Sequence, residues 1–269
     1  MSESSATSAA LQLPSTAVTA MPWSDWRKAT TARIALGRAG VSIPTAEALR
    51  FGCDHALARD AIHQALDVDA LRAQLEQAGH AVVLAHSCAT DRASYLRRPD
   101  LGRQLQPSDL GALRALAASR DGAPDIALVI GDGLSSLALQ RHAVPLLAAL
   151  LPRLPEGTQL APIVVVSQAR VAVADDVGEA LGARLCVMLI GERPGLSSPD
   201  SLGLYLTYAP RRGRHDAERN CISNVRPEGL SFAAAAHKLA WLIAQALKRG
   251  ESGIALKDMS EETAGLNMR

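Results

Sequence analysis

The sequence predicts an α/β protein in which a helix-covered parallel sheet follows a small helical N-terminal domain. Beyond Pro124, longer helical patterns alternate with three short apolar runs, which read DIALVIGDG, APIVVVSQ and RLCVMLIGE. Strands this apolar are buried on both faces of a sheet, and helices between them provide the crossover connections that parallel strands require. Aromatic residues are only 3% of the chain, so the core must consist of small aliphatic side chains. These observations indicate a doubly wound, Rossmann-like sheet.

The N-terminal part of the chain is expected to contain a leader and then mainly helices. Residues 1–21 are rich in Ser, Thr and Ala without a clear period, which is typical of a disordered segment. Pro99 and Gly102 are expected to keep residues 95–103 out of a regular helix. Residues 22–120 form the predicted helical domain, with helices at about 45–52, 54–66, 69–78 and 107–119 and a short β-type run at 81–84.

Residues 121–269 form the predicted Rossmann-like domain. A fourth strand is expected at about 204–209, and a polar loop leads from it to Cys221. The helices of this domain are expected at about 134–151, 175–181 and 230–248. Since the strands are predicted to be parallel, their carboxyl ends should meet at one edge of the sheet.

Composition excludes several classes of function. The 28 basic and 27 acidic residues balance, which argues against a nucleic acid or a membrane surface as a partner held by bulk electrostatics. The first 20 residues contain no Lys or Arg, and the chain contains no apolar run of 18 residues, so neither a secretory signal nor a membrane span is predicted. The protein is therefore expected inside the cell.

Metal and disulfide sites are not predicted either. The four cysteines include no CxxC pair, and the seven histidines include no HExxH or HxxxH pair. The acidic pairs Asp175-Asp176 and Glu261-Glu262 have the right chemistry for a cation, but helix-start charge and solubility of the tail explain them more simply. We therefore expect no resident metal bound by protein side chains.

Ligands of open α/β sheets bind beyond the carboxyl ends of the strands. This rule selects four stretches, namely residues 131–133, 168–171, 191–195 and 221–224. In the first, Asp132 either caps the following helix or accepts a hydrogen bond from a ligand. The sequence around it matches neither GxGxxG nor GxSxG, which argues against a dinucleotide site and an α/β-hydrolase elbow.

The third and fourth stretches carry polar side chains. Glu192 and Arg193 place a carboxylate beside a guanidinium, a pair suited to neutral amide groups, although an ordinary surface turn would look the same. Cys221 is either a nucleophilic thiolate or a small filler, and no base is fixed next to it in the sequence.

Six separated motifs together resemble one known family. They are, in order, RKATTARIALGRAG, YLRRPDLGR, VIGDGLSS, DDVGEALGA, GERPGL and NCISN, the last followed by an Ala-rich helix. Their order and spacing resemble the small subunit of ethanolamine ammonia-lyase over residues 23–250. The leader and the sequence after Ile254 match less distinctively.

The resemblance implies an enzyme subunit, a carbon–nitrogen lyase component that is inactive without its large partner. With a large TIM-barrel subunit, in a hetero-oligomer, it would hold adenosylcobalamin at their interface while ethanolamine is converted to acetaldehyde and ammonia. The family's cofactor contacts carry over onto Val171, Glu192 and Cys221, and no catalytic residue is assigned to this chain. Leaders in the family can address a bacterial microcompartment, so we expect the protein there or in the cytoplasm.

Two other hypotheses stay open on the residues alone. One is a stand-alone Rossmann-like enzyme, such as a hydrolase that uses Cys221 or Ser135 at the strand ends. The other is a regulatory or assembly module without chemistry of its own, because no complete acid–base or metal set is recognisable in the sequence.

Overall fold

A computed structural model describes residues 17–261, so the predicted leader lies largely outside the described residues. Residue contacts divide the chain into two compact units, Met1–Ala56 and Leu57–Arg269. The division falls after Ala56, whereas a domain boundary near residue 120 was expected from the sequence.

The described part of the first unit, residues 17–56, has almost no interior of its own. Among residues 17–56, Pro44 alone is buried, and a two-residue bridge between Thr19 and Arg38 is one of its few backbone pairings. Helix α1, Thr45–His63, begins in this unit and continues into the second. We expected two separate helices here, but Gly52 lies inside one continuous helix, where a glycine costs about 1 kcal/mol relative to Ala without ending the helix.

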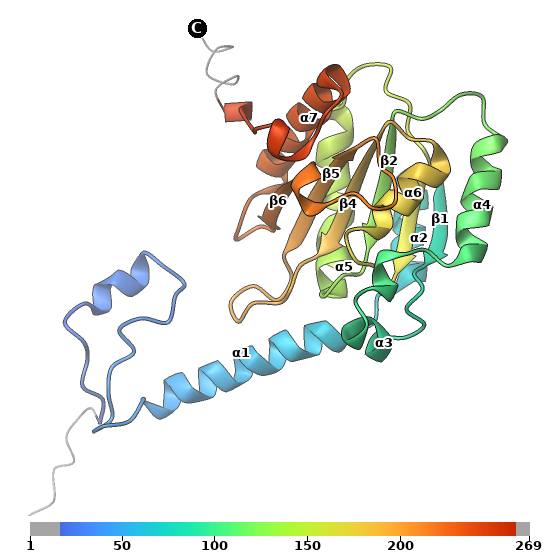
Figure 1. The fold of residues 1–269 in the computed structure, drawn as a ribbon. Helices are drawn as coiled ribbons and strands as arrows, with labels where there is room; N and C mark the ends of the chain where they lie inside the picture. Colours follow the sequence, from blue (N-terminus) through green and yellow to red (C-terminus); the bar gives the residue numbers. More distant parts are fainter. Residues whose placement is uncertain (1–16, 262–269) are drawn as a thin grey trace, which may run out of the picture. The chain divides into compact units, whose positions relative to one another are not determined.

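The second unit contains a six-stranded mixed sheet with the order β1-β3-β2-β4-β5-β6 (Figure 1). Strands β1 to β4 run parallel to one another, whereas β5 is antiparallel to both β4 and β6. The strands are β1 Val82–His86, β2 Ile126–Gly131, β3 Ile163–Ser167, β4 Leu185–Gly191, β5 Leu202–Tyr208 and β6 Arg219–Val225. The α/β class is thus confirmed, while the description of the sheet as Rossmann-like remains a prediction.

The expectation of a fully parallel sheet is wrong for its last two strands. Parallel neighbours need a crossover connection of a dozen or more residues, whereas antiparallel neighbours can be joined directly. Residues 192–201 connect β4 to β5 without a helix, so the chain turns back beside β4. The polar segment around Cys221 was expected to be a loop, but it pairs with β5 as the edge strand β6.

Helices cover both faces of the sheet (Figure 1). The side chains of β2 alternate between two hydrophobic clusters: Ile126, Leu128 and Ile130 pack with α5 and α7, while Ala127 and Val129 pack with α4 and α6. The remaining helices are α2 Val68–Gln77, α3 Arg92–Arg97, α4 Pro107–Ala118, α5 Ser136–Leu150, α6 Val173–Leu181 and α7 Phe232–Arg249, with 3-10 turns at Ser24–Lys28, Leu101–Arg103, Leu151–Arg153, Asp216–Glu218 and Gly253–Ala255.

Residues 57–118 belong to this sheet unit. Strand β1 pairs in register with β3, from Val82 opposite Ile163 to His86 opposite Ser167. Helix α2 contributes Leu71 and Leu75 to the cluster around α5 and α7. These helices and this strand bury their apolar sides against the sheet, which explains why no division appears near residue 120.

None of the helices within residues 17–261 combines the length and the apolar character that crossing a membrane requires.

Candidate functional site

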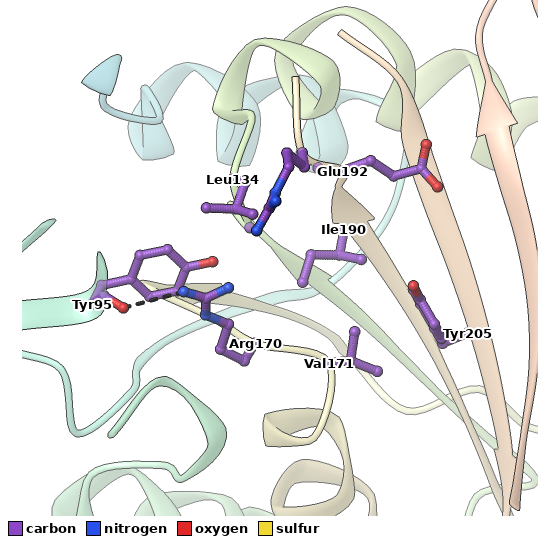
Figure 2. A pocket seen from close by; sticks show the side chains of 10 residues that line it. Tyr95, Leu134, Arg170, Val171, Ile190, Glu192 and Tyr205 are labelled. Carbon is purple, nitrogen blue, oxygen red and sulfur yellow. Dashed lines mark hydrogen bonds between the residues drawn. The ribbon is translucent and has the colours of Figure 1, made fainter. Parts of the chain in front are cut away.

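A cavity of about 430 Å³ lies at the edge of the sheet where β2, β3 and β4 end (Figure 2). Ligand sites of open α/β sheets form at this edge. The cavity is lined by Tyr95, Gly133, Leu134, Arg170, Val171, Ile190, Gly191, Glu192, Arg193 and Tyr205. Three of the four stretches selected from the sequence therefore contribute to one site.

Two glycines bring the loops after β2 and β4 into direct contact. Gly133 has a φ of +59°, and a Cβ atom there would lie 2.2 Å from the carbonyl oxygen of Gly191. A Cβ atom on Gly191 would lie 2.0 Å from the carbonyl oxygen of Ser135. The amide of Leu134 donates to the Gly191 carbonyl at 2.9 Å. Only glycine fits at both positions, and the contact forms one wall of the cavity.

Asp132 ties the loop after β2 to the loop after β3. Its carboxylate accepts from the backbone amides of Gln168 at 2.9 Å and Ala169 at 2.8 Å, and burial raises its pKa. The side chain that caps α5 is Ser135, which accepts from the amide of Ala138. The helix-cap role expected for Asp132 is therefore wrong, while its role as a ligand acceptor stays a prediction. In the structure the carboxylate positions the segment that carries Arg170 and Val171.

Tyr95 and Arg170 also line the cavity. Tyr95 lies outside the four stretches selected from the sequence, and Arg170 lies in one of them but was not named there as a contact residue. Tyr95 lies on the short helix α3 rather than in the expected loop, and its side chain is fully buried. The guanidinium of Arg170 lies 4.2 Å from the centroid of the Tyr95 ring, and that of Arg92 lies 4.6 Å from it. Such contacts are favourable cation–π interactions. Burial raises the pKa of Tyr95 to about 12, so its hydroxyl stays protonated.

A glycine explains how this cluster packs. A Cβ atom on Gly102 would lie 2.9 Å from Cγ of Arg170 and 3.1 Å from Cδ2 of Tyr95. The amide of Arg170 donates to the carbonyl of Gly102 at 2.8 Å. The YLRRPDLGR motif thus supplies both a cavity residue and the glycine that lets its neighbours approach. The seven-residue spacing of Tyr95 and Gly102 was visible in the sequence. Their common partner Arg170 lies far along the chain, so the contact could not be predicted from that spacing.

Comparison with known proteins identifies the family. A family model described as the ethanolamine ammonia-lyase light chain (EutC) matches residues 20–257. The chain belongs to this family. Proteins named ethanolamine ammonia-lyase small subunit are 60% identical in Ralstonia nicotianae, over 91% of both chains, and 59% identical in Azotobacter vinelandii, over 89% of both. A relative with the same name in Pseudomonas syringae is 56% identical over 91% of this chain and 86% of its own.

The resemblance to the ethanolamine ammonia-lyase small subunit is therefore confirmed, and two of its three inferred contact residues line the cavity. Val171 follows β3 and Glu192 follows β4, as expected from the sequence. Glu192 accepts from the Ser201 hydroxyl at 2.8 Å and from the Asn224 amide at 3.1 Å. These two contacts hold the carboxylate at the edge of the cavity.

Cys221, the third inferred contact of this ethanolamine ammonia-lyase family member, lies within β6 rather than after a strand. It pairs directly opposite Tyr205, which lines the cavity, and burial together with the adjacent Cys221 raises the pKa of the Tyr205 hydroxyl. The thiol is exposed and lies 3.3 Å from the Ser223 hydroxyl. Its contact with a cofactor stays a prediction.

Neither nucleophile of the hydrolase hypothesis is placed for attack. The Ser135 hydroxyl donates to the Pro199 carbonyl at 2.7 Å and caps α5, so its bonds are structural. Cys221 has a hydroxyl rather than a base beside its sulfur. A nucleophile needs an adjacent base or a lowered pKa.

The acidic pair at the start of α6 is held by two arginines. Asp175 receives two hydrogen bonds of 2.6 Å from Arg219, and both side chains are 2% exposed. Asp176 receives bonds of 2.8 and 2.5 Å from Arg212. Within the described range, no group of three or more His, Cys, Asp or Glu side chains is arranged to hold a metal ion.

Proposed function

We propose that this chain is the small subunit of an adenosylcobalamin-dependent ethanolamine ammonia-lyase, which converts ethanolamine to acetaldehyde and ammonia together with a large TIM-barrel subunit. Membership of the light chain family supports the reaction and the existence of a partner, since the relatives are named as small subunits. The cavity at the carboxyl edge of the sheet is the observation that supports a cofactor site on this chain.

The lining of the cavity fits part of a corrinoid. A corrin is a broad apolar plate with amides around its rim. Leu134, Val171 and Ile190 offer apolar contact, while Glu192 and Arg193 offer an acceptor and donors for amide groups. The volume of about 430 Å³ lies in the lower half of the range for drug-sized ligands, which is about 300–1,000 Å³. The whole cofactor is much larger, so this chain would form one wall and the large subunit the rest.

The division of labour follows from this lining. When bound, adenosylcobalamin supplies the radical that removes hydrogen from the substrate. The residues of this chain bind and orient: Val171 contacts the apolar plate, and Glu192, held by Ser201 and Asn224, accepts from a rim amide. We assign no catalytic residue to this chain, and we place the substrate groups on the large subunit.

Coexpression with the large subunit tests the proposed function. We expect the isolated chain to show no ethanolamine deamination, and the purified complex to bind adenosylcobalamin, visible in its absorption spectrum, and to release acetaldehyde. The matched control is the large subunit alone with the same cofactor. Full activity of the isolated chain would contradict the proposal, and so would a complex that assembles without binding cobalamin, which would favour an assembly module.

A further inference from the structure

The Tyr95 end of the cavity contains buried polar atoms without partners. Among the described residues, the Tyr95 hydroxyl, Nε of Arg170 and Nη2 of Arg92 are buried without a well-formed hydrogen bond. Arg92 lies near the Tyr95 hydroxyl but can only donate, so no protein group accepts the hydroxyl proton. Tyr95 and Arg170 line the cavity, and Figure 2 shows the Arg170 guanidinium against the Tyr95 ring. Folded proteins leave few buried polar groups unpaired, because each one loses its bonds to water. Three such atoms beside one cavity indicate a missing partner.

The two guanidinium groups are held in place through their other nitrogens. Arg92 donates from Nε to the Ile62 carbonyl at 2.7 Å and from Nη1 to the Gly133 carbonyl at 2.8 Å. Arg170 donates from Nη2 to the Tyr95 carbonyl at 3.3 Å. The unpaired N–H groups are therefore fixed in direction before a ligand arrives, which reduces the cost of binding.

All three unpaired groups are donors, so the missing partner accepts hydrogen bonds. An arginine N–H can only donate, and the protonated Tyr95 hydroxyl has a proton to donate. The charge balance favours the same kind of partner: Arg92 has Asp132 at 3.9 Å, but no acidic side chain within residues 17–261 forms an ion pair with Arg170. An oxygen with full or partial negative charge fits this recess.

We infer that Tyr95 and Arg170 form a recess that receives a hydrogen-bond-accepting oxygen of the ligand, with Arg92 behind the Tyr95 ring. The inference rests on the proposed function, under which the ligand is adenosylcobalamin. That molecule offers two kinds of acceptor oxygen, the carbonyls of its side-chain amides and the phosphodiester of its nucleotide loop. Both share the chemistry that this recess requires.

The Tyr95→Phe variant of the coexpressed complex tests the recess. It removes the hydroxyl and leaves the ring that Arg92 and Arg170 contact. We expect Kd for adenosylcobalamin, measured by titration of the absorption spectrum, to rise about fivefold to tenfold, the loss of one hydrogen bond. The Tm of the cofactor-free complex should change little, because no protein group accepts the proton of this hydroxyl. Tyr208→Phe, on β5 outside the cavity lining, is the matched control and should leave Kd unchanged.

Cobinamide, which lacks the nucleotide loop, separates the two sources of the oxygen. If Tyr95→Phe weakens the binding of adenosylcobalamin but not of cobinamide, the oxygen belongs to the phosphodiester. If it weakens the binding of both corrinoids equally, the oxygen belongs to an amide carbonyl. Arg170→Lys keeps the charge and removes Nε. It should weaken the binding of the same corrinoids that Tyr95→Phe affects.

Unchanged Kd values for both Tyr95→Phe and Arg170→Lys would show that water alone occupies the recess and would overturn the inference. A lowered Tm with unchanged Kd would also overturn it, because the hydroxyl would then be structural. Either result leaves the proposed function standing. A wild-type complex that binds neither corrinoid would contradict the proposed function itself, and this inference with it.

Discussion

Asp132, Gly133 and Gly191 shape the cavity although none of them needs to touch a ligand. The two glycines allow the loops after β2 and β4 to meet at distances that any side chain would block. Asp132 fixes the loop after β3 through two backbone amides. At the scale of single residues, the site therefore depends on backbone geometry first, and the side chains that face the cavity are placed by it.

Glu192→Ala should weaken cofactor binding by about tenfold in the complex. The carboxylate would lose one charged hydrogen bond to a rim amide, worth roughly 1.5 kcal/mol. Titration of the absorption spectrum with adenosylcobalamin measures this change in Kd.

Two controls separate direct contact from loop movement. Glu192→Gln keeps an acceptor oxygen and should lose less affinity than Glu192→Ala. Ser201→Ala removes one of the groups that hold Glu192, at 2.8 Å, without touching the cavity lining. If Ser201→Ala alone reproduced the tenfold loss, loop position rather than contact by Glu192 would be the cause.

At the scale of elements, a buried ion pair attaches the edge strand β6 to helix α6. Arg219 on β6 and Asp175 in the first turn of α6 are each 2% exposed and share two bonds of 2.6 Å. Arg219 also donates to the Thr207 hydroxyl on β5 at 3.0 Å. Burial raises the pKa of Asp175 while Arg219 opposes that rise. The pair fixes how β6, and with it Cys221, sits against the rest of the sheet.

Arg219→Met should lower the free energy of unfolding by about 3–5 kcal/mol, because it leaves Asp175 buried and unpaired. Without Arg219 the folded-state pKa of Asp175 rises further above its unfolded value. Stability contributed by a group with a raised pKa is present at low pH and lost as pH rises through the folded pKa. Urea unfolding should therefore show a larger loss at about pH 8 than at about pH 5.

The exposed pair Arg72–Glu76 is the matched control for this change. Its side chains are 47% and 46% exposed, so solvent screens the pair and Arg72→Met should lower the free energy of unfolding far less than Arg219→Met. A similar loss for both variants would mean that the buried pair contributes no more than a surface pair.

At the scale of the whole molecule, the sheet unit carries the hydrophobic core by itself. Neither hydrophobic cluster of the described residues includes a residue before Leu66. Residues 17–56 expose large apolar side chains instead, among them Trp23, Trp26 and Leu49. Stability of the sheet unit should therefore not depend on the first unit.

Deletion of residues 1–56 should leave a folded sheet unit. We expect a single cooperative thermal transition with Tm within a few degrees of the full chain, because both clusters remain complete. Circular dichroism during heating measures this. A control with Leu128→Ala in the full chain removes a fully buried side chain and should cost about 2–5 kcal/mol. Loss of the cooperative transition in the truncated chain would show that the first unit is part of the fold.

Features that depend on local pattern could be predicted from the sequence. Apolar runs predicted β2, β3 and β4, because strands buried on both faces need continuous apolar residues. The order of strands and helices placed Val171 and Glu192 at the carboxyl edge of the sheet, where the structure shows a cavity. Six motifs were enough to identify the family, which the matched residues 20–257 confirm.

Features that depend on partners far along the chain could not be predicted and are visible only in the folded protein. The direction of β5 and β6 is set by their pairing with β4 and with each other, and an apolar run reads the same in either direction. Asp132 was ambiguous because its partners, Gln168 and Ala169, lie 36 and 37 residues away. Tyr95 contacts Arg170, which lies 75 residues further along the chain. Local sequence patterns do not predict such contacts, because folding brings these residues together through the packing of the whole sheet.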